Sequence, residues 1–210
     1  MKNTLKCVMF LITVSVSPML SQEIDLDKRL AFSIPEYEAE LGGTLNTTIP
    51  NYRILKNPQQ EISEIIETKA VIYKRESDDF FPNLHVWYHF DTAEDRLLGI
   101  RYNWGFYNPT FDSNIDIIKY QALTTQEKRF KKHFKKLECE ISKKLGSPTR
   151  IKDIANDPFK IIRYNYWEDS EKVIALCIWF HRQTLDLAET GIMGDYKIEV
   201  LVTYKNGEKM

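Results

Sequence analysis

The sequence predicts an α+β domain with a mainly antiparallel sheet of about six strands, in the order β-β-β-α-β-β-β. One long amphipathic helix is expected to cover the sheet, because a single segment combines a helix start, an apolar stripe and a helix stop. The other periodic segments are rich in β-branched and aromatic residues, as strands are. We expect a signal peptide over residues 1–21, an N-terminal arm with short helices over 22–66 and the α+β domain over 67–210.

The covering helix is predicted within residues 124–148, TTQEKRFKKHFKKLECEISKKLGSP. Thr124 and Glu127 form a capping-box pattern at its start. Gly146 and Pro148 are typical of a helix end, because glycine adopts the left-handed conformation and proline cannot continue a helix. Between these signals an apolar stripe recurs at three- and four-residue spacing, as a helix lying on a sheet requires. Its members are Phe130, Phe134, Leu137, Ile141 and Leu145.

Residues 1–21 have the pattern of a secretory signal peptide. Lys2 and Lys6 precede an apolar run, and cleavage is expected between Ser21 and Gln22. The run is shorter than the roughly 20 residues that span a bilayer. We therefore expect an exported protein, periplasmic or secreted, with no transmembrane segment in the mature chain. A buried N-terminal helix is the alternative.

Residues 22–66 show a weak pattern that prolines and glycines interrupt. The stretch 33–42 is typical of two helical turns ending at Gly42, and 58–66 of another short helix. We expect this arm to pack on the sheet face opposite the long helix. The reason is that segment 172–181 is apolar on both sides, which is typical of a strand covered twice.

Six strands are expected, at 68–75, 84–90, 97–104, 161–167, 172–181 and 196–204. Side chains alternate in most of them, with Leu84, Val86 and Tyr88 on one side of their strand and His85 and Trp87 on the other. The short polar connection 91–96 predicts that the first three strands form an antiparallel meander.

Signatures of catalysis, metal binding and cofactor binding are absent from the sequence. The four histidines do not cluster. The segment 112–116 resembles the start of a calcium loop, but Ile117 stands at the position of the glycine and Leu123 at that of the final glutamate. The paired acids lie in turns, where nothing desolvates one member as catalysis requires. With 8 glycines in the chain, a phosphate-cradling loop is not expected. The sequence therefore favours a protein that is not an enzyme and predicts no cofactor and no metal.

The outer face of the predicted helix is strongly basic. It carries Lys128, Arg129, Lys131, Lys132, Lys135, Lys136, Lys143 and Lys144 against Glu127, Glu138 and Glu140. One interpretation is a solvated helix face. The other is a docking face for an acidic partner, a phosphorylated surface or anionic lipid, with Lys131, Lys132, Lys135 and Lys136 as candidate partner-binding residues. The formal net charge of −1 provides no general attraction to nucleic acid.

Aromatic residues are frequent near the end of the predicted hairpin. Most are expected in the core, because aromatic side chains fill the layer beneath a helix. A minority could line a groove for a sugar or an apolar small molecule. The candidate ligand-binding residues are Trp87, Tyr102, Trp104 and Tyr107.

The two cysteines of the predicted mature chain are expected to be free thiols. Cys139 lies nine residues after Phe130, which places it opposite the apolar stripe of the helix. Cys177 lies in the middle of the most apolar strand, too far away for the Cα separation of roughly 7 Å that a disulfide allows. We expect Cys177 to be buried and Cys139 to be accessible.

Taken together, these patterns predict an exported, non-catalytic protein that binds another macromolecule. A carrier or sensor of a small apolar or sugar ligand, held between sheet and helix, is the alternative. An enzyme without a recognisable signature is a third possibility, because active sites need not show one.

Overall fold

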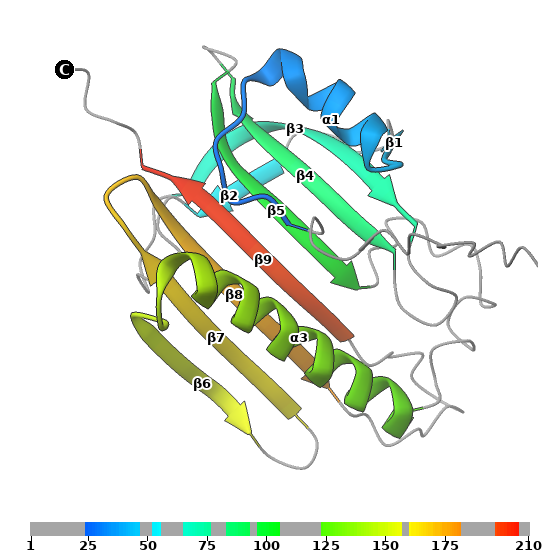
Figure 1. Ribbon diagram of the computed structural model, residues 1–210, viewed down its shortest axis with the longest axis vertical. Coiled ribbons are helices and arrows are strands. Elements are labelled where there is room, and N and C mark those ends of the chain that lie inside the picture. The colour runs from blue at the N-terminus through cyan, green and yellow to red at the C-terminus, as the bar shows by residue number, and fades with distance from the viewer. Residues whose placement is uncertain are drawn as a thin grey trace, which may run out of the picture.

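The computed structural model describes residues 24–46, 52–55, 65–76, 83–92, 96–105, 123–156, 160–181 and 196–205. They form an α+β fold with a largely antiparallel sheet, as predicted (Figure 1). The helical elements are the 3₁₀ turn η1 (Ala31–Ser33) and the helices α1 (Ile34–Glu40) and α3 (Leu123–Leu145). The strands are β1 (Thr44–Asn46), β2 (Tyr52–Leu55), β3 (Ile65–Arg75), β4 (Leu84–Asp91), β5 (Leu97–Gly105), β6 (Arg150–Asn156), β7 (Lys160–Glu168), β8 (Lys172–His181) and β9 (Tyr196–Tyr204).

The described strands make one nine-stranded sheet in the order β1-β3-β4-β5-β9-β8-β7-β6, and β2 also pairs with β3. Every pairing is antiparallel. All six predicted strands are present, but the expected number of strands is too low. Strands β1, β2 and β6 were missed. The first two contain only 3 and 4 residues, too few to show an alternating pattern.

Strand β6 was missed for a different reason. A bulge between Asp153 and Ala155 shifts its register against β7 and breaks the two-residue period. The strand lies at the edge of the sheet, and Ile151 and Ile154 are 49% and 54% exposed. Its pattern is therefore that of an edge strand with little buried surface.

Helix α3 lies over β8 and β9, with its apolar stripe against the sheet (Figure 1). Phe130, Phe134, Leu137 and Ile141 are each at most 5% exposed. The helix ends as predicted, since the N–H of Gly146 donates to the carbonyl oxygen of Ser142 at 2.9 Å and Gly146 has a φ of +83°. Strand β7 also contacts this segment, since Asn165 donates to Glu138 at 2.7 Å and the indole N–H of Trp167 donates to the carbonyl oxygen of Gly146 at 3.0 Å. Strand β6 lies beyond β7 at the edge of the sheet.

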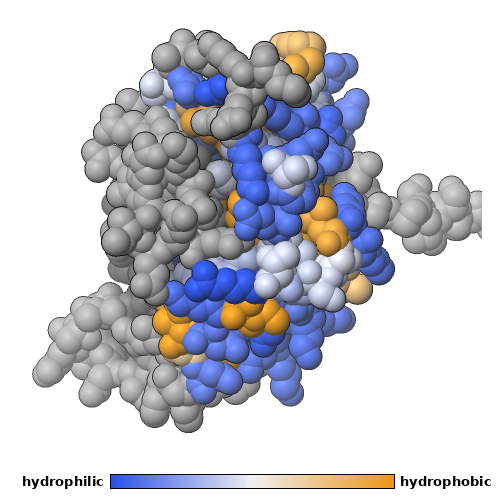
Figure 2. Space-filling view, turned by 90° about the vertical axis from the view of Figure 1, so that its left-hand side faces the viewer, coloured by the Kyte–Doolittle hydropathy of each residue, from blue (hydrophilic) through white to orange (hydrophobic). Residues whose placement is uncertain are grey.

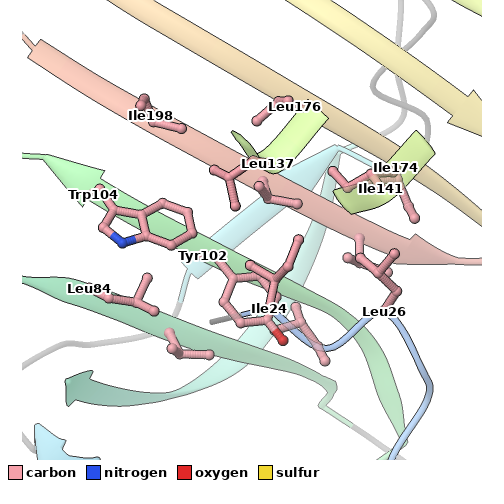
Figure 3. Packing of buried hydrophobic residues seen from close by; sticks show 14 of the residues in the cluster. Ile24, Leu26, Leu84, Tyr102, Trp104, Leu137, Ile141, Ile174, Leu176 and Ile198 are labelled. Carbon is pink, nitrogen blue, oxygen red and sulfur yellow. The ribbon is translucent and has the colours of Figure 1, made fainter. Parts of the chain in front are cut away.

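The N-terminal arm covers the same face as α3, so the prediction that it covers the opposite face is wrong. Ile24, Leu26 and Ile34 belong to one buried cluster with Leu137 and Ile141 of α3. Figure 3 shows Ile24 and Leu26 close to Tyr102, with Leu137 and Ile141 over the neighbouring strands. The physical reason is that α3 lies over β8 and β9 and leaves the β3 to β5 half of this face to the arm.

The helix expected within 58–66 is also wrong at its end, because Ile65 and Ile66 belong to β3, where they pair with β2. The rest of that segment lies outside the described residues, and so does the predicted signal peptide. The short helix expected within 33–42 is confirmed as α1, and Gly42 follows it with a φ of +71°.

The sheet therefore has two different faces. The helix face bears α1, α3 and the buried cluster. We call the other the helix-free face, since neither described α-helix lies on it (Figure 1). Alternation places Trp87, Arg101, Leu201 and Cys177 there. Many of its side chains are nevertheless buried, including Trp87 at 1% and Cys177 at 3% exposure.

Candidate functional site

A row of polar side chains crosses the helix-free face near one end of the sheet. The register pairs His85 of β4 with Asn103 of β5, and Asn103 with Glu199 of β9. It continues from Glu199 to Cys177 of β8 and from Cys177 to Tyr164 of β7. Side chains that face each other across neighbouring antiparallel strands have Cβ atoms about 5 Å apart. The row is thus continuous over five strands.

Two atoms at the start of this row lack hydrogen-bond partners among the described residues. They are Nδ1 of His85 and Oδ1 of Asn103, both shielded from solvent. Asn103 is 7% exposed as a whole residue. A buried acceptor without a partner destabilises a fold by about 1–3 kcal/mol. Such groups are uncommon in native proteins and often mark functional positions.

Glu199 lies between two cations without making a close ion pair. Its Oε2 atom is 3.9 Å from Nε of Arg101 and 3.8 Å from Nζ of Lys197. Both distances exceed that of a good hydrogen bond. Lys197 also lies over the ring of Trp179, at 5.4 Å from the centroid. The carboxylate therefore keeps capacity to accept hydrogen bonds.

The far end of the row is chemically inert. Burial raises the pKa of Cys177 to about 12, so this thiol stays protonated and is a poor nucleophile. Burial also raises the pKa of its neighbour Tyr164. Cys139, by contrast, is exposed on α3, and both cysteines are free. The prediction of one buried and one accessible thiol is confirmed.

The predicted ligand-binding aromatics do not come together. Tyr102 and Trp104 point into the helix face, at 0% and 2% exposure, whereas Trp87 points to the helix-free face. The hydroxyl of Tyr102 donates to the carbonyl oxygen of Asp25 at 2.8 Å, and Trp104 contacts the ring of His133 at 4.8 Å between centroids. Tyr107 lies outside the described residues. Tyr102 and Trp104 thus anchor the arm and α3.

The predicted partner-binding lysines lie on the outer surface of α3. Lys131, Lys132 and Lys135 are exposed and Lys136 is half-buried. Lys131 pairs with Glu127 at 2.6 Å. On the side of the molecule that Figure 2 shows, hydrophilic residues dominate and the described apolar surface is limited to small, separate patches.

A further polar cluster, beneath α1, is structural. Glu38 is 0% exposed and accepts hydrogen bonds from Arg75 at 2.7 and 2.8 Å. The hydroxyl of Tyr88 also donates to Glu38, and burial raises the pKa of Tyr88. All partners of the carboxylate belong to the protein, so this cluster fixes α1 to β3 and β4.

Within the described ranges, no group of three or more histidine, cysteine, aspartate and glutamate side chains is placed to hold a metal ion. None of the helices in those ranges is long and apolar enough to cross a membrane. Comparisons with protein-family models, with curated proteins and with solved structures find no match to this chain. Function is therefore argued from the two surfaces described above.

Sequence reasoning missed His85, Asn103 and Glu199 as a group. A signal was available, since each is a polar residue in a strand that is rich in apolar and aromatic residues. Their proximity depends on strand order and register, and β5 pairs with β9 across more than ninety residues of sequence.

Proposed function

We propose that this is an exported, non-catalytic binding protein whose basic α3 surface docks onto an acidic segment of another protein. We define the basic α3 surface as Lys128, Lys132, Lys135, Lys143 and Lys144, which are all exposed. The predicted signal peptide supports export. Recognition of the acidic segment is electrostatic in this proposal, and the sheet serves as the rigid support of α3.

One observation carries this proposal: the acids of α3 are occupied while these lysines are not. Glu127 pairs with Lys131, and Glu138 accepts a hydrogen bond from Asn165 of β7 at 2.7 Å. Among the described residues, Lys132, Lys135 and Lys143 make no ion pair. Because eight basic residues stand against three acids on this helix, its outer surface is net positive and attracts acidic partners.

The alternative function, a carrier of a small ligand held between the sheet and α3, is supported less well. Between the sheet and α3, the buried cluster is continuous and includes Leu137, Ile141, Leu176 and Val200, each at 0% exposure. A small-ligand site is usually concave and only partly filled by side chains. An exposed basic surface over a filled interface favours a macromolecular partner.

A fluorescein-labelled oligoglutamate peptide is a direct probe of this surface, with the chain beginning at Gln22 and fluorescence anisotropy as the readout. We expect binding that weakens steeply as salt is added, because exposed charges are screened over about 8–10 Å. The triple variant Lys132→Glu, Lys135→Glu, Lys143→Glu should bind at least about tenfold more weakly, a loss of about 1.4 kcal/mol or more.

The matched control replaces the same three lysines with arginine, which retains the charge and the side-chain length. It should bind the peptide as the wild type does. If the charge-reversed protein bound as tightly as the wild type, or if the arginine variant lost binding equally, the basic α3 surface would not be the docking surface.

A further inference from the structure

The start of the polar row on the helix-free face has the features of a binding site. His85 and Asn103 face each other across β4 and β5. Both carry a buried atom without a partner among the described residues, and Asn103 is more than nine-tenths buried. Two such groups side by side point to an outside molecule that supplies the missing hydrogen bonds. Unpartnered polar groups that are kept for ligand binding lower the stability of the free protein in exchange for function.

The neighbouring groups determine what this molecule must offer. Oδ1 of Asn103 and the Glu199 carboxylate only accept hydrogen bonds, whereas Arg101 and Lys197 only donate them. Burial, and next the charge of Lys74, lower the pKa of His85, so its ring is neutral near pH 7. A neutral imidazole has one donor and one acceptor nitrogen. The site therefore mixes donors and acceptors within a few ångströms.

The site lies near the ends of its strands. His85 is the second residue of β4, and Asn103 is two residues from the end of β5. Lys74 pairs with Glu76 at 2.8 Å beside His85, and the Lys74 and Lys197 side chains are 38% and 37% exposed. Partly exposed lysine side chains therefore lie near the row, Lys74 beside His85 and Lys197 beside Glu199.

We propose that His85, Asn103 and Glu199 bind a neutral polyhydroxylated molecule, a mono- or disaccharide, at this end of the helix-free face. A hydroxyl group is both donor and acceptor, so a ring of hydroxyls can pair with the imidazole of His85, the amide oxygen of Asn103 and the Glu199 carboxylate at once. Trp87, which faces Arg101 in the register, is buried on the same side of the sheet at 1% exposure. A metal ion is disfavoured because Arg101 and Lys197 both lie within 4 Å of Glu199.

Asn103→Leu is the discriminating variant, because leucine has nearly the same shape and removes the unpartnered oxygen. Thr203→Val is its matched control. Thr203 lies on the same face, is 6% exposed and has a buried hydroxyl oxygen without a partner among the described residues, but it faces Gly99 rather than the row. Both variants should melt at the same temperature as the wild type or higher.

Only Asn103→Leu should lose the response to sugar. Thermal unfolding would be recorded with glucose, galactose and N-acetylglucosamine as probes. We expect at least one sugar to raise the melting temperature of the wild type and of Thr203→Val, in proportion to the logarithm of its concentration above the dissociation constant. Asn103→Leu should show no such rise.

Three results would overturn the proposal. A lower melting temperature for Asn103→Leu without sugar would mean that the side chain has a structural partner. A sugar response equal in wild type and Asn103→Leu would place binding elsewhere. No response of the wild type to any of the three sugars, or a response to divalent cations instead, would exclude a site of this chemistry.

Discussion

Glu38 of α1 and Arg75 of β3 are joined by two hydrogen bonds, of 2.7 and 2.8 Å, at a point where their side chains are 0% and 8% exposed. The pair connects the N-terminal arm to the sheet across 37 residues of sequence. Gly43 is required close by, because a Cβ atom there would lie 2.5 Å from Oε2 of Glu38. The arm is therefore part of the folded domain.

Replacing Glu38 with leucine should lower the free energy of unfolding by about 3–5 kcal/mol, because Arg75 would stay buried without its carboxylate. The double variant Glu38→Leu, Arg75→Leu should lose less than Glu38→Leu alone, since it removes both charges. Urea unfolding of the three proteins checks this. A double variant less stable than the single one would show that the ion pair itself is net stabilising.

His89 makes stability depend on pH. Burial, with a smaller contribution from the charge of Arg101, lowers its pKa to about 3, and Nδ1 lies 3.1 Å from the hydroxyl of Thr68. The unfolded chain has a histidine pKa of about 6.5, so it binds a proton that the folded chain does not. The stability that the neutral ring contributes is complete above the unfolded pKa of about 6.5 and is lost progressively as the pH falls toward 3.

Between pH 7.5 and 5, His89 should account for a loss of about 2 kcal/mol in the free energy of unfolding. His89→Asn keeps a polar atom near Thr68 but cannot titrate, so its stability should fall less over this range by about that amount. Unfolding by urea at both pH values measures the difference. Parallel losses in the two proteins would mean that His89 is not the titrating group.

The apolar stripe of α3 offers a test of core packing. Leu137 is 0% exposed, and Leu137→Ala should cost about 2–5 kcal/mol of unfolding free energy. Lys135 is on the opposite side of the helix and exposed. Lys135→Ala should change stability by no more than about 0.5 kcal/mol. Equal costs for the two would mean that another face of the helix contacts the sheet.

The helices and strands differ in how far the sequence alone predicts them. Helix α3 was predictable because its stripe, its lysines and Gly146 all indicate the same helix. Strands β4 and β5 were predictable because large apolar residues recur at every second position of their sequences, although burial extends to both sides of each strand. Strand β6 was not, because its bulge removes the period and its burial is slight.

The candidate sites divide in the same way. The outer lysines of α3 follow directly from helical periodicity. Sequence alternation separates Trp87 from Val86 and Tyr88 within one strand, but it does not say which side meets α3. That choice depends on contacts between distant segments, as does the approach of Glu199 to Asn103. Pattern alone therefore grouped Trp87 with Tyr102 and Trp104, which lie on the other side of the sheet.

The orientation of α3 underlies both the core and the proposed docking surface, and one thiol measurement tests it most directly. Cys139 lies on the exposed side with Lys132, Lys135 and Lys143, while Cys177 is buried beneath the opposite face of the sheet at 3% exposure. Titration of the chain beginning at Gln22 with a thiol reagent should label one cysteine in the native protein, identified as Cys139 by peptide mapping, and two after unfolding. Labelling of neither cysteine in the native protein, or of Cys177 first, would contradict this orientation and with it the basic α3 surface.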